Sequence, residues 1–80
     1  MNPEVALRGM DSVEAICVMD RYLEEAMRSN LKQVRIIHGK GTGVLRKAVH
    51  ESLKRHKYVK KYRLGVYGEG EDGVTIAEFE

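Results

Sequence analysis

The segment that most constrains this chain is a β-branched run that passes directly into a glycine-rich loop and then into an amphipathic helical pattern. The run covers residues 34–37, the loop residues 38–43 and the helical pattern about residues 44–56. Dense β-branched residues favour an inner strand. Apolar residues at helical spacing favour a helix with one buried face. A strand, a loop and a helix in this order predict a layered α/β fold, in which helices pack on a sheet.

The rest of the chain supplies three more strands and one more helix. Residues 5–7 are apolar and precede a turn with glycine, which predicts a short buried strand. Asp11, with a glutamate three residues later, resembles a capping box, and apolar residues recur at helical spacing from there to the break at residues 29–30. Alternating apolar residues predict two further strands at 61–66 and 74–79.

The expected order is therefore βαβαββ. Crossovers between parallel strands are right-handed, so both helices reach the same face of the sheet if both crossovers progress in the same direction. We therefore expect a two-layer α/β sandwich, of the α+β class, with four strands and two helices on one face. The chain has 80 residues, of which 42% are apolar, and this is enough for one core and a single domain over residues 1–80.

Composition excludes several classes of protein. The longest apolar stretch, at residues 15–19, is far shorter than the roughly 20 residues of a membrane span, and no signal peptide opens the chain. We therefore expect a soluble, cytoplasmic protein with no membrane partner. Cys17 is the single cysteine, so neither an internal disulfide nor a multi-cysteine zinc site can form, and its thiol is expected to be buried.

Charge is segregated along the chain, although the net charge is only +2. Residues 32–63 contain eleven basic side chains and one acidic one, whereas residues 64–80 contain five acidic side chains and no basic one. Such an excess predicts a surface that binds a polyanion such as nucleic acid. The alternative is a solvated helix face without a partner. The basic residues expected on the exposed side of the second helix are Arg46, Lys47, Lys54 and Arg55.

The glycine-rich loop has the features of an anion site. Gly39, Gly41 and Gly43 allow the backbone to approach a ligand closely, and the loop ends at a helix N-terminus, whose free N–H groups favour an anion. Lys40 adds a donor suited to phosphate, and Thr42 lies in the same loop. The pattern is neither a Walker A loop nor a dinucleotide fingerprint, so no nucleotide cofactor is expected. A tight turn that needs positive φ angles is the alternative interpretation.

Two side chains beside this loop are further candidates. His38 stands at the carboxyl end of an inner strand, where open α/β sheets bind their ligands, and is either a general base and phosphate donor or a histidine that fixes the turn. Arg8 ends the first strand and is expected near His38, where its guanidinium suits a phosphate; a salt bridge to a carboxylate of the next helix is the alternative. His50 and His56 cannot converge on one metal ion from a helix and are interpreted as surface or boundary residues.

Together these residues resemble the small MutS-related (Smr) domain family. The resemblance rests on Leu-Arg-Gly at residues 7–9, Ile-Ile-His-Gly-Lys-Gly-Thr-Gly-Val-Leu-Arg at 36–46, Tyr-Val-Lys at 58–60 and the segment at 68–76. The resemblance covers nearly the whole chain. More specifically, the chain resembles the C-terminal Smr domain of the second bacterial MutS family. This resemblance implies a βαβαββ two-layer sandwich with a mixed sheet of order 1-2-4-3, like the C-terminal domain of translation initiation factor three.

The resemblance also implies a function. Members of the family bind nucleic acid, either DNA or structured RNA and the ribosome, and have a nicking-endonuclease activity in parent proteins tied to DNA recombination, mismatch-type repair or ribosome quality control. The chain is then expected to be a piece of a larger MutS-like protein and a monomer as an isolated domain. No cofactor and no metal ligand are implied within the domain, although cleavage could require a divalent metal ion.

The residues that match the family motifs are Arg8, His38, Gly39, Lys40 and Gly41. In an endonuclease, His38 would handle a proton, while Arg8, Lys40 and the loop amides would stabilise the pentacoordinate phosphate. The family's first motif usually has an acidic residue where this chain has Ala6. Two functions therefore stay open, a nicking endonuclease and a module that binds nucleic acid or the ribosome without cutting.

Overall fold

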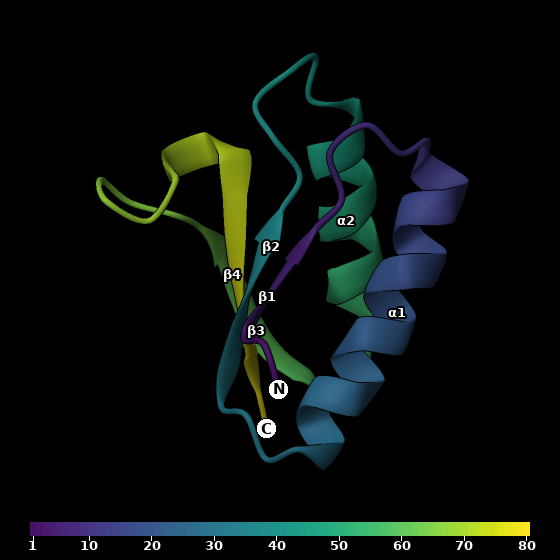
Figure 1. The fold of residues 1–80 in the computed structure, drawn as a ribbon, viewed down its shortest axis with the longest axis vertical. Coiled ribbons are helices and arrows are strands. Elements are labelled where there is room, and N and C mark those ends of the chain that lie inside the picture. The colour runs from purple at the N-terminus through teal and green to yellow at the C-terminus, as the bar shows by residue number, and fades with distance from the viewer.

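The computed structural model describes residues 1–80, and its elements follow the expected order (Figure 1). They are β1 (Glu4–Ala6), α1 (Ser12–Arg28), β2 (Gln33–Ile37), α2 (Val44–Arg55), β3 (Val59–Leu64), the 3-10 helix η1 (Glu71–Gly73) and β4 (Val74–Phe79). The predicted βαβαββ order is confirmed. Neither α1 nor α2 has the length and hydrophobicity that crossing a membrane requires.

The four strands form one mixed sheet in the order β1-β2-β4-β3. β1 pairs with β2 in parallel, and β4 pairs with both β2 and β3 in antiparallel fashion. Both helices lie on one side of this sheet, and no helix covers the other side (Figure 1). The expected two-layer sandwich is therefore confirmed. We call the two sides of the sheet the helix face and the open face.

The core lies between the helices and the helix face of the sheet. Side chains alternate between the two faces of a strand, so Val34 and Ile36 of β2 both point toward the helices and are almost fully buried. They belong to one cluster with fully buried residues of the two helices, of which the largest are Met19, Leu23 and Leu53. The odd-numbered residues of β2 consequently point to the open face.

Two loops, at the carboxyl ends of β1 and β2, lead into the two helices. Asp11 is the N-cap of α1, and its carboxylate accepts a hydrogen bond from the Glu14 N–H at 2.9 Å, as the capping-box pattern predicts. Gly43 stands at the N-cap of α2 and supplies no side-chain acceptor. The start of α2 is therefore the more open of the two helix N-termini.

The structure corrects three details of the sequence analysis. β1 ends at Ala6, one residue earlier than expected, although Leu7 stays fully buried. β3 begins at Val59, two residues earlier than expected, with a shift in its pairing register near its start. Cys17 is exposed rather than buried. Two residues along a helix turn the side chain by roughly 200°, and this places the thiol opposite the buried stripe of α1.

Leu23 provides a test of this core. The Leu23→Ala variant is expected to lose about 2–5 kcal/mol of unfolding free energy, because a side chain with no exposed surface leaves a cavity when it is truncated. Val13→Ala, on the same helix but 77% exposed, is the matched control and should change stability by less than about 0.5 kcal/mol. Urea unfolding measures both, and equal losses would contradict the assigned layers.

Candidate nucleic-acid interface

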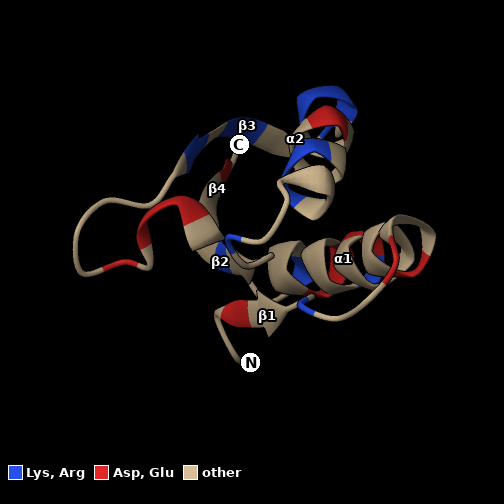
Figure 2. Cartoon of the chain, turned by 90° about the horizontal axis from the view of Figure 1, so that it is seen from above, with Lys and Arg blue, Asp and Glu red and all other residues tan.

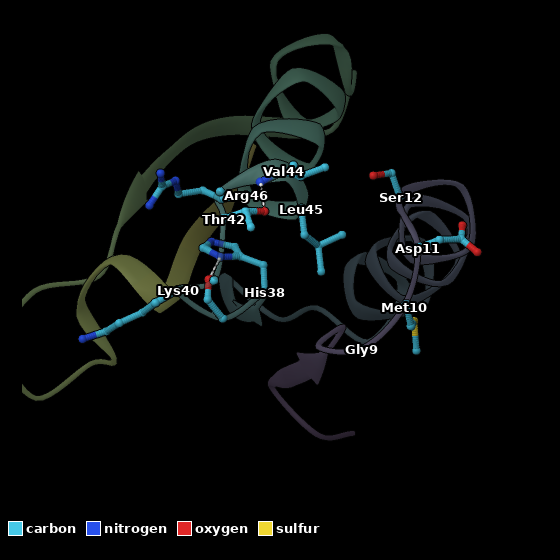
Figure 3. Close-up of a pocket in the computed structure, with 13 residues that line it drawn as sticks. Gly9, Met10, Asp11, Ser12, His38, Lys40, Thr42, Val44, Leu45 and Arg46 are labelled. Atoms are coloured by element: carbon cyan, nitrogen blue, oxygen red, sulfur yellow. Dashed lines mark hydrogen bonds between the residues drawn. The ribbon is translucent and has the colours of Figure 1, made fainter.

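The two loops that lead into the helices enclose a hollow of about 400 Å³ at one edge of the sheet (Figure 3). One side is formed by residues 9–12 and the other by residues 38–46, which include the whole glycine-rich loop. Both loops follow the carboxyl ends of parallel strands, where ligands bind in open α/β sheets. The expected position of a crevice at this edge is therefore confirmed.

The first turn of α2 faces this hollow and is suited to an anion. The turn contains no acidic residue, and its one side-chain acceptor is Thr42 Oγ1, 3.4 Å from the Val44 nitrogen. Gly43 precedes the helix with a φ of 89°, a conformation that favours glycine. A Cβ atom at this position would lie 2.9 Å from Nη2 of Arg46. Glycine here therefore keeps both the turn and the arginine in place.

His38 is buried at the back of the hollow, with only 4% of its surface exposed. Its Nδ1 lies 3.0 Å from the Gly39 carbonyl oxygen, and its Nε2 lies 2.7 Å from Thr75 Oγ1 (Figure 3 shows the first bond). His50 Nε2 also lies 2.7 Å from Thr75 Oγ1. One threonine hydroxyl thus joins two histidines, one from the end of β2 and one from α2.

The hydrogen-bond partners assign the protons of this cluster. A carbonyl oxygen can only accept, so neutral His38 carries its proton on Nδ1 and its Nε2 accepts from the Thr75 hydroxyl. Since the Thr75 hydroxyl donates its single proton to His38, its oxygen can only accept a hydrogen bond from His50, which therefore carries its proton on Nε2. Both nitrogens of His38 are therefore engaged. His50 Nδ1 is the one ring nitrogen of the pair that keeps a free lone pair.

Burial keeps both imidazoles neutral. Desolvation lowers the pKa of His38 below its ordinary value, an effect that its hydrogen bond to the Gly39 carbonyl partly opposes. Desolvation is also the main cause of the lowered pKa of His50, and the neighbouring His38 and Arg46 lower it further. The ring centroids of the two histidines are 6.1 Å apart, so a positive charge on one imidazole would disfavour protonation of the other.

Arg8 does not share the crevice of His38, contrary to expectation. The parallel register pairs Ala6 with Ile37, and one further step along both strands places Leu7 level with His38 on the helix face. Arg8 follows Leu7 by one residue, and a shift of one residue along a strand moves a side chain to the other face of the sheet. Arg8 therefore points to the open face. Its stem lies beside Gly39, and it lines a different hollow on the open face. It forms none of the salt bridges in the structure.

Lys40 and Arg46 are both paired with carboxylates of η1. Lys40 Nζ lies 3.0 Å from Glu71 Oε1 and 3.7 Å from Asp72 Oδ1, and Figure 3 shows its side chain extending away from His38. The hydrogen bond to Glu71 raises the pKa of Lys40, which therefore stays positively charged. Arg46 Nη1 lies 3.8 Å from Asp72 Oδ2. The acidic end of the chain thus folds back onto the glycine-rich loop.

The remaining basic charge lies on α2 and around the start of β3. Figure 2 shows basic segments on α2 and β3 and acidic segments in the loop before β4. Arg46, Lys47 and Lys54 line one hollow of about 480 Å³ on α2, whereas Arg55 lies apart, in a groove beside α1. Lys61 and Arg63 of β3 are paired with Glu78 and Glu69. The exposed basic residues of this region without a salt bridge are Lys47, Lys54, Arg55, Lys57 and Lys60.

Sequence reasoning did not include among the site residues His50, Tyr62 and Arg35, which line these hollows, or Thr75, which is fully buried and bonded to both histidines. His50 was interpreted as a boundary residue, and its half-buried position agrees, but its contact with Thr75 was not expected. Tyr62 packs against His50 with ring centroids 5.0 Å apart. Arg35 lines the hollow of Arg8 on the open face. The strand alternation at 74–79 was the available signal for Thr75, since it puts this residue on the helix face.

The histidine cluster predicts a pH dependence of stability. Both histidines have a lowered pKa in the folded state, so the unfolded chain binds more protons as the pH falls below about 6.5. The free energy of unfolding should therefore fall between about pH 7.5 and about pH 5.5. In the His50→Gln variant this fall should be smaller, as measured by urea unfolding at both pH values. An unchanged pH dependence in that variant would contradict the assignment.

Comparisons with known proteins agree with this geometry. The family model for the Smr domain matches residues 5–80. Endonuclease MutS2 of Clostridium tetani is 58% identical over 77 residues, and that of Clostridium novyi is 60% identical over 76. These matches cover 96% and 95% of this chain but 10% of each relative, so the chain spans about a tenth of their length.

Two solved structures have the same fold. The Smr domain of Thermus thermophilus MutS2 superimposes with a TM-score of 0.94 at 44% identity, over 96% of both chains. YdaL, a stand-alone small MutS-related protein from Escherichia coli, gives a TM-score of 0.92 at 21% identity, over 98% of this chain and 64% of that one, and supports the fold alone. The sequence motifs, the strand order and these matches agree, and the chain belongs to the Smr domain family.

Proposed function

We propose that this domain binds nucleic acid through backbone phosphates. The observation that carries the proposal is the set of unpaired basic side chains on α2, next to the open N-terminus of the same helix. Phosphate groups are recognised by lysine, arginine and the amides of a helix N-terminus without reading base sequence. The relatives named MutS2 support the same partner. DNA and structured RNA both present such phosphates, and the ribosome is an alternative source of them.

The hollow on α2 is the proposed main contact. Arg46, Lys47 and Lys54 line it together with Tyr62, whose ring offers a surface for a sugar or a base. The neighbouring loop amides extend this surface toward the hollow of His38. A polyanion that crosses α2 can therefore touch side-chain cations and helix amides in one path. We propose little sequence preference, because the cations and amides contact the backbone and stacking on an aromatic ring tolerates any base.

Phosphodiester cleavage is the second candidate function, and it rests on the relatives named endonucleases. Ala6, which replaces the family's acid, pairs with Ile37 and is exposed on the open face, the same face as Arg8. His38 lies on the helix face. A carboxylate at position 6 would therefore act beside Arg8 and would not orient His38. We propose that cleavage by this chain is weak.

The structure contains no group of three or more His, Cys, Asp or Glu side chains that could hold a metal ion. We therefore assign no step to a metal ion held by the chain alone. A magnesium ion held jointly with the phosphates of the nucleic acid is tested in the cleavage assay below. Of the proposed catalytic groups, Arg8 and Lys40 are suited to charge stabilisation. His38 could transfer a proton after giving up its bond to Thr75.

Binding should depend on salt and on α2. If about five phosphates are neutralised, log affinity for duplex DNA should fall against log salt with a slope near −4 to −5. Reversal of charge at Lys47 and Lys54 should weaken binding and make the slope less negative by about 2. Fluorescence anisotropy with a labelled duplex measures both quantities. Arg21→Glu on α1 is the control, and an effect as large there, or a flat salt response, would overturn the proposal.

Cleavage should respond to a restored acid. Ala6→Asp is expected to raise the nicking rate on supercoiled plasmid, on the order of 10²-fold, and to change the affinity little, because a catalytic carboxylate acts mainly in the transition state. Ala6→Asn has the same shape without the charge and serves as the control. Reactions with and without magnesium are compared. If none of the three proteins nicks, the domain is a binding module; a high rate without the acid would make the carboxylate irrelevant.

A further inference from the structure

The open face of the sheet carries a second hollow that none of the functions above has used. Its volume is about 490 Å³, and it lies on the opposite side of the sheet from His38. Three of the residues that line it are basic, namely Arg8, Arg35 and Lys40, and none is acidic. The other residues are glycine or apolar. A concave surface with three positive charges and no negative one is suited to an anion.

Two glycines leave room for the stems of two of these cations. A Cβ atom on Gly39 would lie 2.9 Å from Cγ of Arg8, and one on Gly73 would lie 3.2 Å from Cγ of Lys40. Both glycines also line the hollow. The stems of the arginine and the lysine thus occupy space that any other residue would fill. The glycines therefore allow Arg8 and Lys40 to line the same hollow as Arg35.

Arg35 is held in the hollow by one end of its guanidinium. Its Nη2 donates to the Glu69 carbonyl oxygen at 3.0 Å, and its Nη1 lies 3.7 Å from a Glu4 carboxylate oxygen. Its Nε is buried and has no hydrogen-bond partner. Buried donors without a partner are uncommon in folded proteins. Because Nε is shielded from solvent, a ligand in the hollow would meet the exposed terminal nitrogens of the guanidinium, which the Glu69 carbonyl holds in place.

The carboxylates near these cations do not block the hollow. The Arg35–Glu4 contact is long, and 43% and 42% of the two side chains are exposed. The Lys40–Glu71 pair is more exposed still. Solvent-exposed ion pairs contribute little, so an incoming dianion or diester can displace them. Arg8 needs no such displacement, because it has no salt-bridge partner.

We propose that Arg35, together with Arg8 and Lys40, forms a phosphate subsite on the open face of the sheet. The inference rests on the proposed function, because the phosphate is assigned to a nucleic-acid backbone. Lys40 borders both this hollow and the hollow of the glycine-rich loop. A strand that crosses the edge of the sheet at Gly39 can therefore place one phosphate on each side. Position 6 lies on the open face as well but does not line this hollow.

The first test uses inorganic phosphate and nuclear magnetic resonance. The Nε–H signals of Arg8 and Arg35 are followed while phosphate is added at constant ionic strength, with chloride as the replaced ion. Both signals should shift and saturate together, whereas the Nε–H signal of Arg21 on α1 should not move. If the Arg8 and Arg35 signals respond no more than that of Arg21, the hollow does not bind phosphate and the proposal is overturned.

The second test measures duplex binding by Arg35→Gln. Glutamine keeps a donor for the Glu69 carbonyl but loses the charge, so affinity should fall roughly tenfold and the salt slope should become less negative by about 1. Arg21→Gln is the matched control. Arg8→Gln, at an exposed side chain without a hydrogen bond, should give a similar loss even if Arg35→Gln lowers the thermal midpoint. The double variant should lose less than the product of the two single effects, because both side chains hold one phosphate.

The outcomes separate this proposal from the proposed function. If the Lys47 and Lys54 reversals weaken binding while Arg35→Gln and Arg8→Gln behave like Arg21→Gln, the subsite is wrong and the proposed function stands. If none of these variants weakens binding, both fail. Duplexes with hydroxyl ends and with 5′-phosphate ends distinguish the source of the phosphate. An equal loss on both supports a backbone phosphate, and a loss confined to the phosphorylated duplex overturns that assignment in favour of a terminal one.

Discussion

The pairing of β2 with its two neighbours is the constraint on which the rest of this structure depends. β2 lies between β1 and β4, so its register with each of them decides which side chains meet on each face. The pairing of Ile36 with Thr75 puts the threonine beside the helices, where it joins His38 and His50. The pairing of Ala6 with Ile37 sends Arg8 to the other face. A slip of one residue in either ladder would exchange these two environments.

Ion pairs between distant parts of the chain separate the basic side chains that are free from those that a partner must first release from a carboxylate. Residues 32–63 are strongly basic, but the acidic residues that follow fold back on Lys40, Arg46, Lys61 and Arg63. These pairs remove much of the positive charge from β3 and from the tip of the glycine-rich loop. The unpaired basic side chains of this segment lie on α2, around the start of β3 and at Lys32. The net charge of residues 32–63 therefore overstates the basic surface that is free of carboxylates. The fold determines where that free basic surface lies.

The sequence was sufficient for the fold and for the position of the glycine-rich loop, because both depend on local patterns. Strand and helix periods, the Asp11 cap and the glycine spacing all act within a few residues. The side of the sheet reached by Arg8 was not predicted, because it depends on the register between β1 and β2, which pairs Ala6 with Ile37 and leaves Arg8 one residue out of step with His38. The contact between His50 and Thr75 joins residues 25 apart and needs the packing of α2 on β4. In the sequence, Arg35 is one of eleven basic residues at 32–63, and nothing local distinguishes it from the others. Its position in the hollow of the open face is known only from the fold.

The alternation of side chains between the two faces of the sheet separates two kinds of chemistry at one edge of the sheet. On the helix face, burial favours neutral imidazoles, and the hydrogen bonds of His38 leave it no free nitrogen. On the open face, the guanidinium groups of Arg8 and Arg35 line one hollow and are suited to bind phosphate oxygens. Hydrolysis of a phosphodiester needs stabilisation of negative charge as well as proton transfer. The two requirements are placed in two hollows that share Gly39 and Lys40. Binding needs only one of the two faces, whereas cleavage needs both to act on the same phosphate, and this is why binding is the better supported function of a chain that has Ala6 on the open face.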